Sequence, residues 1–212
     1  MTCLDIFPID INMRLLGLDK DCFSTWWAKL PQGTTLVVQP KIDGFAIGLR
    51  YKYGQLVDAY SREDPRVIEI IRTINTIPLS IDDSLKVEVE LEGVLYSPTF
   101  SSKFSQDQFI SSSNKLLETK APLAFLAFHI FSSKSDELSD LTQLQKWGFE
   151  VPITLRTEDP KQVKRWYTQW KNNELFSNLP TNGIVAKCNS SSTKSSLGVT
   201  SSSPNWALAL TR

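Results

Sequence analysis

The stretch Lys41-Ile42-Asp43-Gly44 lies between two runs that are typical of β-strands, residues 35–40 and residues 45–51. A lysine held where two strands meet is shielded from water, can lose its proton near neutral pH, and is then a nucleophile. Asp43 stands two residues after the lysine and therefore shares its face of an extended chain. Gly44 permits a tight bend and a close approach of a ligand to the backbone. This arrangement suits an enzyme that carries a nucleotide on a lysine.

The composition is that of an ordinary globular protein. The chain has 212 residues, which suits one domain or one domain with a small appendage, and its 41% hydrophobic content is enough for a normal core. The 23 Lys and Arg residues balance 23 Asp and Glu residues, so the formal net charge is zero. The whole molecule therefore does not attract nucleic acid, and such binding has to use local patches such as Lys161, Lys164, Arg165 and Lys171.

Cysteine usage and the N-terminus favour a cytoplasmic protein. Three distant cysteines and one histidine show no metal-ligand spacing, and three cysteines cannot all pair. A reducing compartment fits this usage best. Residues 1–5 have neither a basic nor an apolar signal region, and the longest apolar run, residues 121–131, contains Pro122 and His129 and is too short to span a bilayer. We expect no metal ligands in the protein and no association with a membrane.

Periodicity and turn residues predict an α+β fold of mostly antiparallel strands with helices outside. Helices are expected within residues 13–30, 66–74 and 139–147 and from Pro160, where Val163, Trp166, Tyr167 and Trp170 have helical spacing. Strands are expected within residues 35–60 (with a turn at Tyr53-Gly54), 85–96, 123–131, 182–188 and 206–210. Residues 101–114 are expected to form a loop or short helix, and residues 189–203 a Ser/Thr-rich loop.

Several residues that could carry chemistry have simpler interpretations. The alternating strand places Glu88, Glu90 and Glu92 on one face, which is more often a solvated sheet face than a metal site. His129 is more often a satisfied core histidine than a catalyst, and the stripe of Trp166 and Trp170 is expected to be core.

Four segments in order carry a family resemblance. They are Gln39-Pro40-Lys41-Ile42-Asp43-Gly44, Ser61-Arg62, Glu90-Leu91-Glu92-Gly93 and Asn182-Gly183-Ile184-Val185-Ala186-Lys187, followed by the ending Pro204-Asn205-Trp206-Ala207-Leu208-Ala209. This set resembles the adenylation domain of bacterial-type NAD-dependent DNA ligases, from about residue 13 to residue 212.

The resemblance implies a nucleotidyltransferase (ATP-grasp-like) adenylation fold, with antiparallel sheets flanked by helices. Residues 1–30 would be an N-terminal segment with a short helix, and residues 31–212 the adenylation domain. It also implies a DNA ligase that forms a lysyl-AMP intermediate with NAD and Mg²⁺ and joins nicked double-stranded DNA in replication and repair.

Site residues follow from the matched positions. Lys41 would be the nucleophile, Asp43 would orient it, and Lys187 would neutralise the α-phosphate. Gln39 and Phe128 match positions beside the adenine, with Phe128 stacking on it, and Arg62 would contact the sugar or the approaching phosphate. A second cation such as Lys187 is also expected to lower the pKa of Lys41.

The sequence departs from the family at chemical positions. Val94 stands where the family has Glu, and Glu92, which could substitute, is one strand repeat or roughly 7 Å away. Asn182 replaces Asp, and Thr211 with Arg212 replaces Lys. Residues 63–65 replace Gly-Asp-Gly, and residues 111–115 shorten an arginine-rich segment.

The resemblance covers neither a helical domain for the nicotinamide half of NAD nor an OB barrel, zinc cluster or helix-hairpin-helix array. We therefore expect self-adenylation to exceed nick sealing, with an accessory DNA-binding protein as a candidate partner for the sealing step. Two alternatives stay open: a nucleotide- or nucleic-acid-binding module with impaired catalysis, and a polynucleotide ligase that uses ATP, with DNA or RNA as the acceptor.

Overall fold

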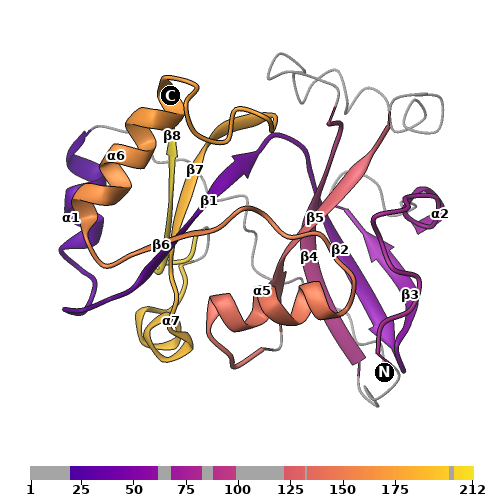
Figure 1. Cartoon of the computed structure of the whole chain (residues 1–212). Coiled ribbons are helices and arrows are strands. Elements are labelled where there is room, and N and C mark those ends of the chain that lie inside the picture. The colour runs from indigo at the N-terminus through magenta and orange to yellow at the C-terminus, as the bar shows by residue number, and fades with distance from the viewer. Residues whose placement is uncertain (1–19, 62–67, 83–87, 99–121, 132, 201–202) are drawn as a thin grey trace.

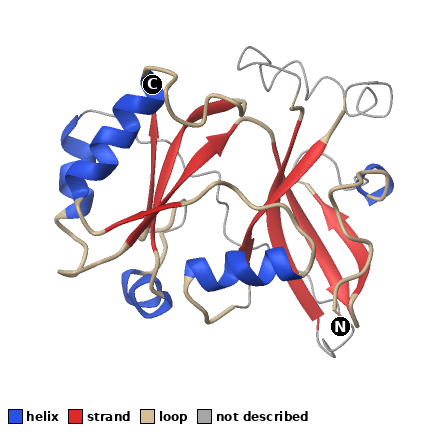
Figure 2. Cartoon of the chain, in the orientation of Figure 1, coloured by secondary structure: helices blue, strands red, loops and turns tan. Residues whose placement is uncertain are grey.

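The computed structural model describes residues 20–61, 68–82, 88–98, 122–131, 133–200 and 203–212, which form two four-stranded antiparallel sheets with helices packed against them (Figures 1 and 2). Strand order is β6-β1-β7-β8 in the first sheet and β3-β2-β4-β5 in the second. The strands are β1 (Leu36–Ile42), β2 (Phe45–Lys52), β3 (Gln55–Tyr60), β4 (Glu88–Tyr96), β5 (Ala124–Ile130), β6 (Leu155–Thr157), β7 (Thr181–Cys188) and β8 (Ala207–Thr211). The helices are α1 (Lys20–Trp27), α2 (Ile68–Ile71), α5 (Glu137–Lys146), α6 (Pro160–Lys171) and α7 (Ser191–Leu197).

The chain crosses from one sheet to the other at Asp43-Gly44. β1 ends at Ile42 in the first sheet, and β2 begins at Phe45 in the second. The lysine stretch therefore lies at the junction of the two sheets, which is where the flanking apolar runs place it.

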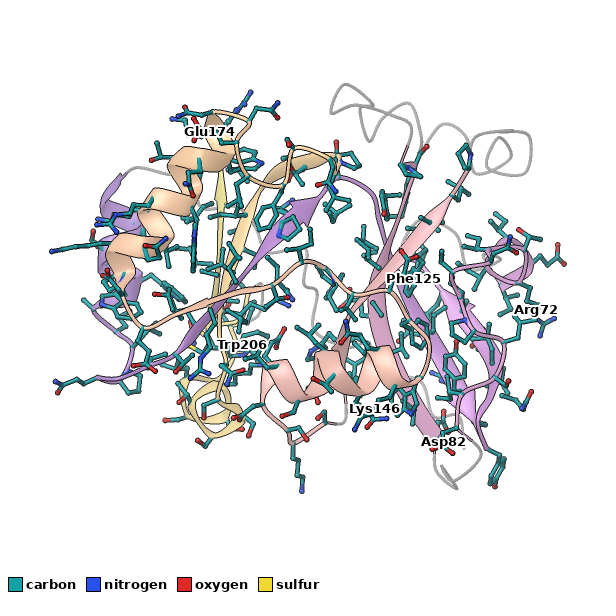
Figure 3. All side chains as sticks on the ribbon, in the orientation of Figure 1. Arg72, Asp82, Phe125, Lys146, Glu174 and Trp206 are labelled. Carbon is teal, nitrogen blue, oxygen red and sulfur yellow. The ribbon has the colours of Figure 1, made fainter. Side chains whose placement is uncertain are left out.

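Each sheet has its own core on the face that its helices cover. In the second sheet, Leu49, Leu91 and Phe125 pack with residues of α5 and α2. In the first sheet, Val38 and Ile184 pack with Phe23 of α1 and with Val163 and Trp170 of α6, while Trp206 at the start of β8 completes this cluster. Figure 3 shows Phe125 and Trp206 in these two separate layers. A third, smaller cluster joins Val94, Leu126 and Phe128 of the second sheet to Ile42 of the first.

Local sequence explains several element boundaries. Tyr53 and Gly54 have positive φ angles of 50° and 75° between β2 and β3, which matches the left-handed conformations that a two-residue hairpin requires. Helix α6 starts at Pro160 after Asp159, whose carboxylate accepts a hydrogen bond from the Lys161 backbone N–H at 2.9 Å.

The predicted α+β architecture is confirmed, with two corrections. Residues 189–203 were expected to form a loop but contain α7, because Ser190 caps a helix whose last carbonyl, on Leu197, accepts from the Asn205 side chain. Strand β6 was not predicted, because its three residues are too few to show an alternating hydrophobic pattern. Residues 66–67, 85–87 and 101–114 lie outside the described residues.

None of the helices in the described ranges is long and apolar enough to cross a membrane.

Candidate functional site

Gln39, Lys41 and Lys187 lie on one face of the first sheet. Across β1 and β7 the opposed pairs are Val37 with Lys187, Gln39 with Val185, and Lys41 with Gly183. Opposed residues and alternate residues along a strand share a face, so the three predicted side chains emerge together. Lys187 is level with Val37, which puts its strand position about 13 Å from that of Lys41 at about 3.3 Å per residue.

Lys41 donates a hydrogen bond from Nζ to Oδ1 of Asn182 at 2.9 Å. A β-bulge makes this contact possible, because the register shifts from Lys41 opposite Gly183 to Ile42 opposite Thr181. Such an irregularity can turn a side chain out of regular alternation. The nearest described hydrogen-bond partner of the predicted nucleophile is thus a neutral amide, at the position where the resemblance expects a carboxylate.

Burial lowers the pKa of Lys41 below its ordinary value, and the nearby charge of Asp43 opposes this only in part. Burial likewise raises the pKa of Asp43, against the effect of Lys41. Lys187 is not among the charges that act on Lys41, which corrects the expectation that it depresses this pKa. The lysine amine is therefore easier to deprotonate than a solvated one, and burial is the cause.

Gln39 is buried, with 2% of its surface exposed, and donates from Nε2 to Oγ1 of Thr154 at 3.0 Å. Thr154 in turn donates to the carbonyl of Pro152 at 2.9 Å. The amide beside the predicted adenine position is thus held in one orientation.

The second sheet contributes Glu92 and Phe128. Glu92 is buried opposite Gly48 on β2 and His129 on β5. The centroid of the Phe128 ring lies 5.2 Å from Nζ of Lys187, so the structure brings these two predicted residues together across the sheets.

The positions that depart from the family have other contacts. Val94 packs in the small apolar cluster with Leu126 and Phe128, so no charge stands there. Thr211 lies opposite Gly183 in the row that contains Lys41. Arg212 does not take the place of the expected lysine, because its guanidinium lies 5.4 Å from the Trp170 ring and donates to the Lys171 carbonyl of α6 at 3.2 Å.

Gly44 is needed for contact between strands. A Cβ at this position would lie 2.4 Å from the carbonyl oxygen of Leu95 and 2.8 Å from Cγ2 of Val94. The sequence predicted that a ligand approaches the backbone at this glycine. In the structure, strand β4 makes that close approach instead. Arg62 lies outside the described residues.

Glu137 and Lys194 are part of the site and were not predicted. Glu137 is 1% exposed, accepts a hydrogen bond from Lys187 Nζ at 2.7 Å, and pairs with Lys194 through its other oxygen. Although burial opposes ionisation, the two lysines lower the pKa of Glu137 to about 2. Glu137 lies 50 residues from Lys187 and 57 from Lys194, so no spacing in the sequence could have revealed the group.

His129, which was expected to be a core histidine, is only half-buried by its surface exposure. Burial lowers its pKa to about 4, so it is neutral at pH 7. Its ring stacks on Trp206 with centroids 6.5 Å apart.

A metal ion would have few protein ligands here. Among the described residues, no three His, Cys, Asp or Glu side chains are grouped so that they could hold a metal. Such a site fits an ion that is carried mainly by substrate phosphates and water, as Mg²⁺ often is.

A family model for the NAD-dependent DNA ligase adenylation domain matches residues 18–108 and 112–211. The chain belongs to this family. A DNA ligase from Mycoplasma genitalium is 32% identical over 196 residues, which cover 82% of this chain and 29% of the relative. A DNA ligase from Borrelia turicatae is 29% identical over 224 residues, which cover 94% of this chain and 32% of the relative. The adenylation domain described here thus corresponds to less than a third of the length of these relatives.

Solved ligase structures share the fold. Pmar-Lig_PreS3 superposes with a TM-score of 0.58 at 11% identity, over 93% of this chain and 46% of that one. A putative ATP-dependent DNA ligase from Aquifex aeolicus gives a TM-score of 0.50 at 16% identity, over 79% of this chain and 44% of that one. The α+β nucleotidyltransferase fold of the adenylation domain is therefore confirmed.

Proposed function

We propose that this adenylation domain transfers adenylate from NAD to Lys41 and forms a lysyl-AMP adduct that supplies DNA nick joining. The observation that carries the proposal is the state of Lys41. It is a partly buried lysine at the junction of two sheets, has a lowered pKa, and is hydrogen-bonded to the neutral amide of Asn182. A neutral amine keeps a lone pair for attack while one of its N–H groups donates to Asn182.

Adenylate transfer to Lys41 exchanges one bond to the α-phosphorus for another. The lone pair of Lys41 Nζ forms a bond to the α-phosphorus, and the bond from that phosphorus to the bridging oxygen breaks. Nicotinamide mononucleotide leaves with the electron pair of that bond. Nζ releases a proton to solvent, since Lys41 is only partly buried. Asp43 orients the amine, and Lys187 neutralises charge on the α-phosphate.

Other residues of the site bind the base. Phe128 offers an aromatic face to the adenine, and the anchored amide of Gln39 lies on the face that carries Lys41. Glu92 lies on β4, close to the sugar in this proposal. Mg²⁺ supplies further neutralisation of phosphate charge when it is bound.

Family membership favours NAD as the adenylate donor, and the names of the relatives favour nicked double-stranded DNA as the acceptor. In this proposal the adduct serves DNA replication and repair in the cytoplasm, together with an accessory DNA-binding protein. A donor role for ATP is the second candidate, because an ATP-dependent ligase shares the fold.

Intact-mass analysis after incubation with NAD or ATP and Mg²⁺ tests the first step. We expect one AMP adduct per chain with NAD, and peptide mapping should place it on Lys41. Lys41→Ala should abolish the adduct while leaving the temperature of unfolding close to that of the parent. An adduct on Lys187, or one that persists in Lys41→Ala, would show that Lys41 is not the nucleophile.

The alternative of a binding module without catalysis has its own support, because Lys187 is already paired with Glu137 and Val94 lacks a charge. Nucleotide binding measured by calorimetry without any adduct would favour that alternative.

A further inference from the structure

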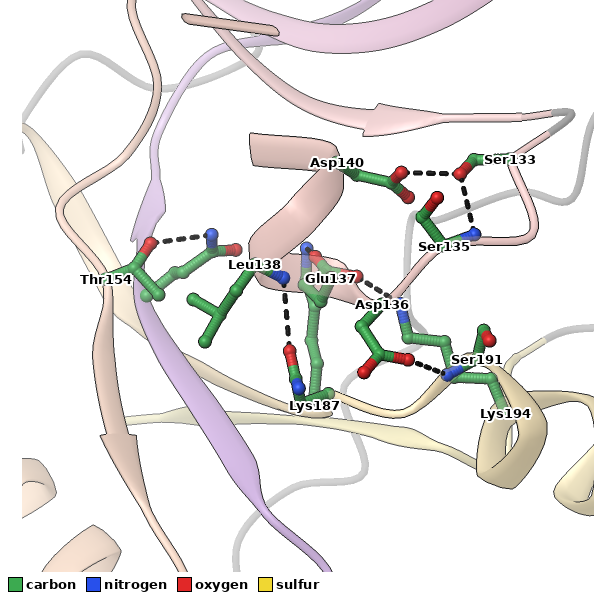
Figure 4. A network of polar contacts seen from close by, with 12 residues as sticks. Ser133, Ser135, Asp136, Glu137, Leu138, Asp140, Thr154, Lys187, Ser191 and Lys194 are labelled. Carbon is green, nitrogen blue, oxygen red and sulfur yellow. Dashed lines mark hydrogen bonds and ion pairs between the residues drawn. The ribbon is translucent and has the colours of Figure 1, made fainter. Parts of the chain in front are cut away.

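A buried ion cluster links Lys187 to two residues that the proposed chemistry does not use. One carboxylate oxygen of Glu137 accepts from Lys187, and the other accepts from Lys194. The exposed side-chain fractions are 6% for Lys187, 2% for Glu137 and 13% for Lys194. Figure 4 shows Lys187 of strand β7 and Lys194 of helix α7, which follows β7 in the chain, both close to Glu137 of α5. The three residues are thus a coupled unit largely removed from water.

The charges of this unit do not cancel. One carboxylate faces two ammonium groups, which leaves one positive charge in the cluster. The ammonium of Lys187 also lies over the Phe128 ring, and that of Lys194 lies 5.1 Å from the centroid of the Trp206 ring. Ring faces are electron-rich and attract the ammonium groups that lie over them. An anionic phosphate at Lys187 would therefore meet a net positive charge.

The backbone around Glu137 fixes the carboxylate in place. The N–H of Glu137 donates to the carbonyl of Asn189 at 2.9 Å, and the N–H of Leu138 donates to the side chain of Asn189 at 3.1 Å. On the other side, the N–H of Ser191 donates to Asp136 at 2.9 Å. The start of α5 is thus bound to the turn between β7 and α7, the elements that carry Lys187 and Lys194.

We propose that Glu137 and Lys194 form a charge-compensating pair that keeps Lys187 ionised and oriented toward the α-phosphate. Glu137 is then a positioning residue for adenylate transfer. The proposal rests on the function proposed above for Lys187. Its physical basis is that two neighbouring ammonium groups removed from water repel each other unless a carboxylate stands between them, so loss of Glu137 alone leaves an uncompensated buried charge.

Other titratable groups face the cluster from each neighbouring element. His129 of β5 is neutral at pH 7, and Asp136 and Asp140 flank Glu137 in sequence. Burial raises the pKa of Cys188 on β7 to about 11, so it stays protonated below that pH.

The test compares E137Q, K194Q and the double variant E137Q/K194Q with the parent. Relative to the parent, the rate of adduct formation in E137Q should fall further at pH 9 than at pH 7, because two neighbouring buried ammonium groups favour the loss of one proton. K194Q should raise the NAD concentration for half-maximal rate while keeping the parent's pH profile. The double variant has the parent's net charge at the cluster and should recover most of the rate at pH 9. Glu88→Gln, which loses an exposed ion pair with Lys52, is the control and should match the parent.

A second measurement does not depend on the nucleotide. In E137Q two buried ammonium groups repel, so one proton is bound more weakly in the folded state than in the unfolded state. Unfolding then takes up a proton, and the temperature of unfolding of E137Q should rise with pH from 7 to 9 relative to the double variant. This result would hold even if the parent formed no adduct, so failure of the proposed function is distinguishable.

The stability of E137Q/K194Q relative to E137Q decides between charge compensation and its absence. Charge compensation predicts that E137Q/K194Q is more stable than E137Q, including the case in which only the double variant folds. A double variant that is equally or less stable than E137Q, or a pH profile of E137Q that parallels the parent's, would overturn the proposal.

Discussion

Asn182 sets the environment of the nucleophile more directly than any residue that was predicted to do so. A carboxylate at hydrogen-bond distance would stabilise the ammonium form of Lys41, whereas an amide accepts the same hydrogen bond without a charge. Replacement of the family's Asp by Asn therefore works in the same direction as burial, which already lowers the pKa of Lys41. Loss of this charge need not disable the site.

Asn182→Asp tests this interpretation with almost no change of shape. The new carboxylate should raise the pKa of Lys41, so a smaller fraction of the amine is neutral at any pH below that pKa. The rising limb of the pH profile for adduct formation should move to higher pH by about one unit, with about a tenfold lower rate at pH 7. Asn172→Asp, at the exposed end of α6, serves as the control. An unchanged or acid-shifted profile would contradict the argument.

Phe128→Leu keeps apolar bulk and removes the aromatic face. It should weaken nucleotide binding by about 1–3 kcal/mol if the base stacks there. Calorimetric titration would measure this, with Phe131→Leu as a control on a neighbouring aromatic that packs edge-on against His129. Equal affinities of parent and Phe128→Leu would identify Phe128 as a packing residue only.

The geometry of the site depends on the connection between strands β1 and β2. The bulge at Lys41 and Ile42 turns Asn182 toward the lysine, and Gly44 lets the chain pass close to β4. Both features belong to the connection between β1 and β2, so the geometry of the nucleophile depends on how closely the two sheets meet.

Gly44→Ala should therefore disturb both stability and activity. The added Cβ meets the backbone oxygen of Leu95, which a side-chain rotation cannot relieve, and we expect a cost of about 1–3 kcal/mol from overpacking. At Gly33, which has a φ of 76°, nothing lies within 4 Å of an added Cβ, so Gly33→Ala should cost about 1 kcal/mol from the backbone conformation alone. Urea unfolding measures both values, and a smaller cost at Gly44 than at Gly33 would contradict this account.

The net charge of the whole molecule affects its affinity for DNA. The net charge is zero. Two basic residues of α6 already contact aromatic rings: Nζ of Lys164 lies 5.7 Å from the Phe23 ring centroid, and Nζ of Lys171 lies 5.7 Å from that of Tyr167. Affinity for a nucleic-acid backbone depends on the number of phosphates that are neutralised. The attack of Lys41 on a bound nucleotide has no such requirement.

We therefore expect nick sealing by this 212-residue chain to be much less efficient than self-adenylation and to fall steeply with salt. Between about 50 and 200 mM salt, the rate of nick sealing should drop by orders of magnitude, as expected when DNA binding depends on contacts with phosphates. The rate of adduct formation should change by less than about threefold over the same range. Parallel assays of adduct and of ligated product across this range would measure both. Robust sealing at physiological salt would contradict the prediction.

The local sequence pattern was sufficient to predict most of the strands and helices and to place Gln39 and Lys41 on one face of β1. The strand expected within residues 85–96, the turn at Tyr53-Gly54 and the helix from Pro160 each depend on neighbours in the chain, and the structure confirms them as β4, the β2–β3 turn and α6. The expected solvated face of that strand is wrong at Glu92, which is buried. Motif order identified the family. Strand periodicity also places Gln39 and Lys41 on one face, because both lie on the same strand.

Contacts between distant segments could not be predicted in this way. α7 has a polar, serine-rich sequence with little helical tendency of its own, and it is secured by Asn205 and by the pairing of Lys194 with Glu137. The partner of Lys187 is a glutamate on a helix that packs mainly on the other sheet. A charge in a buried site depends on which groups surround it in space, and only the docking of the two sheets brings Glu137, Lys187 and Lys194 together.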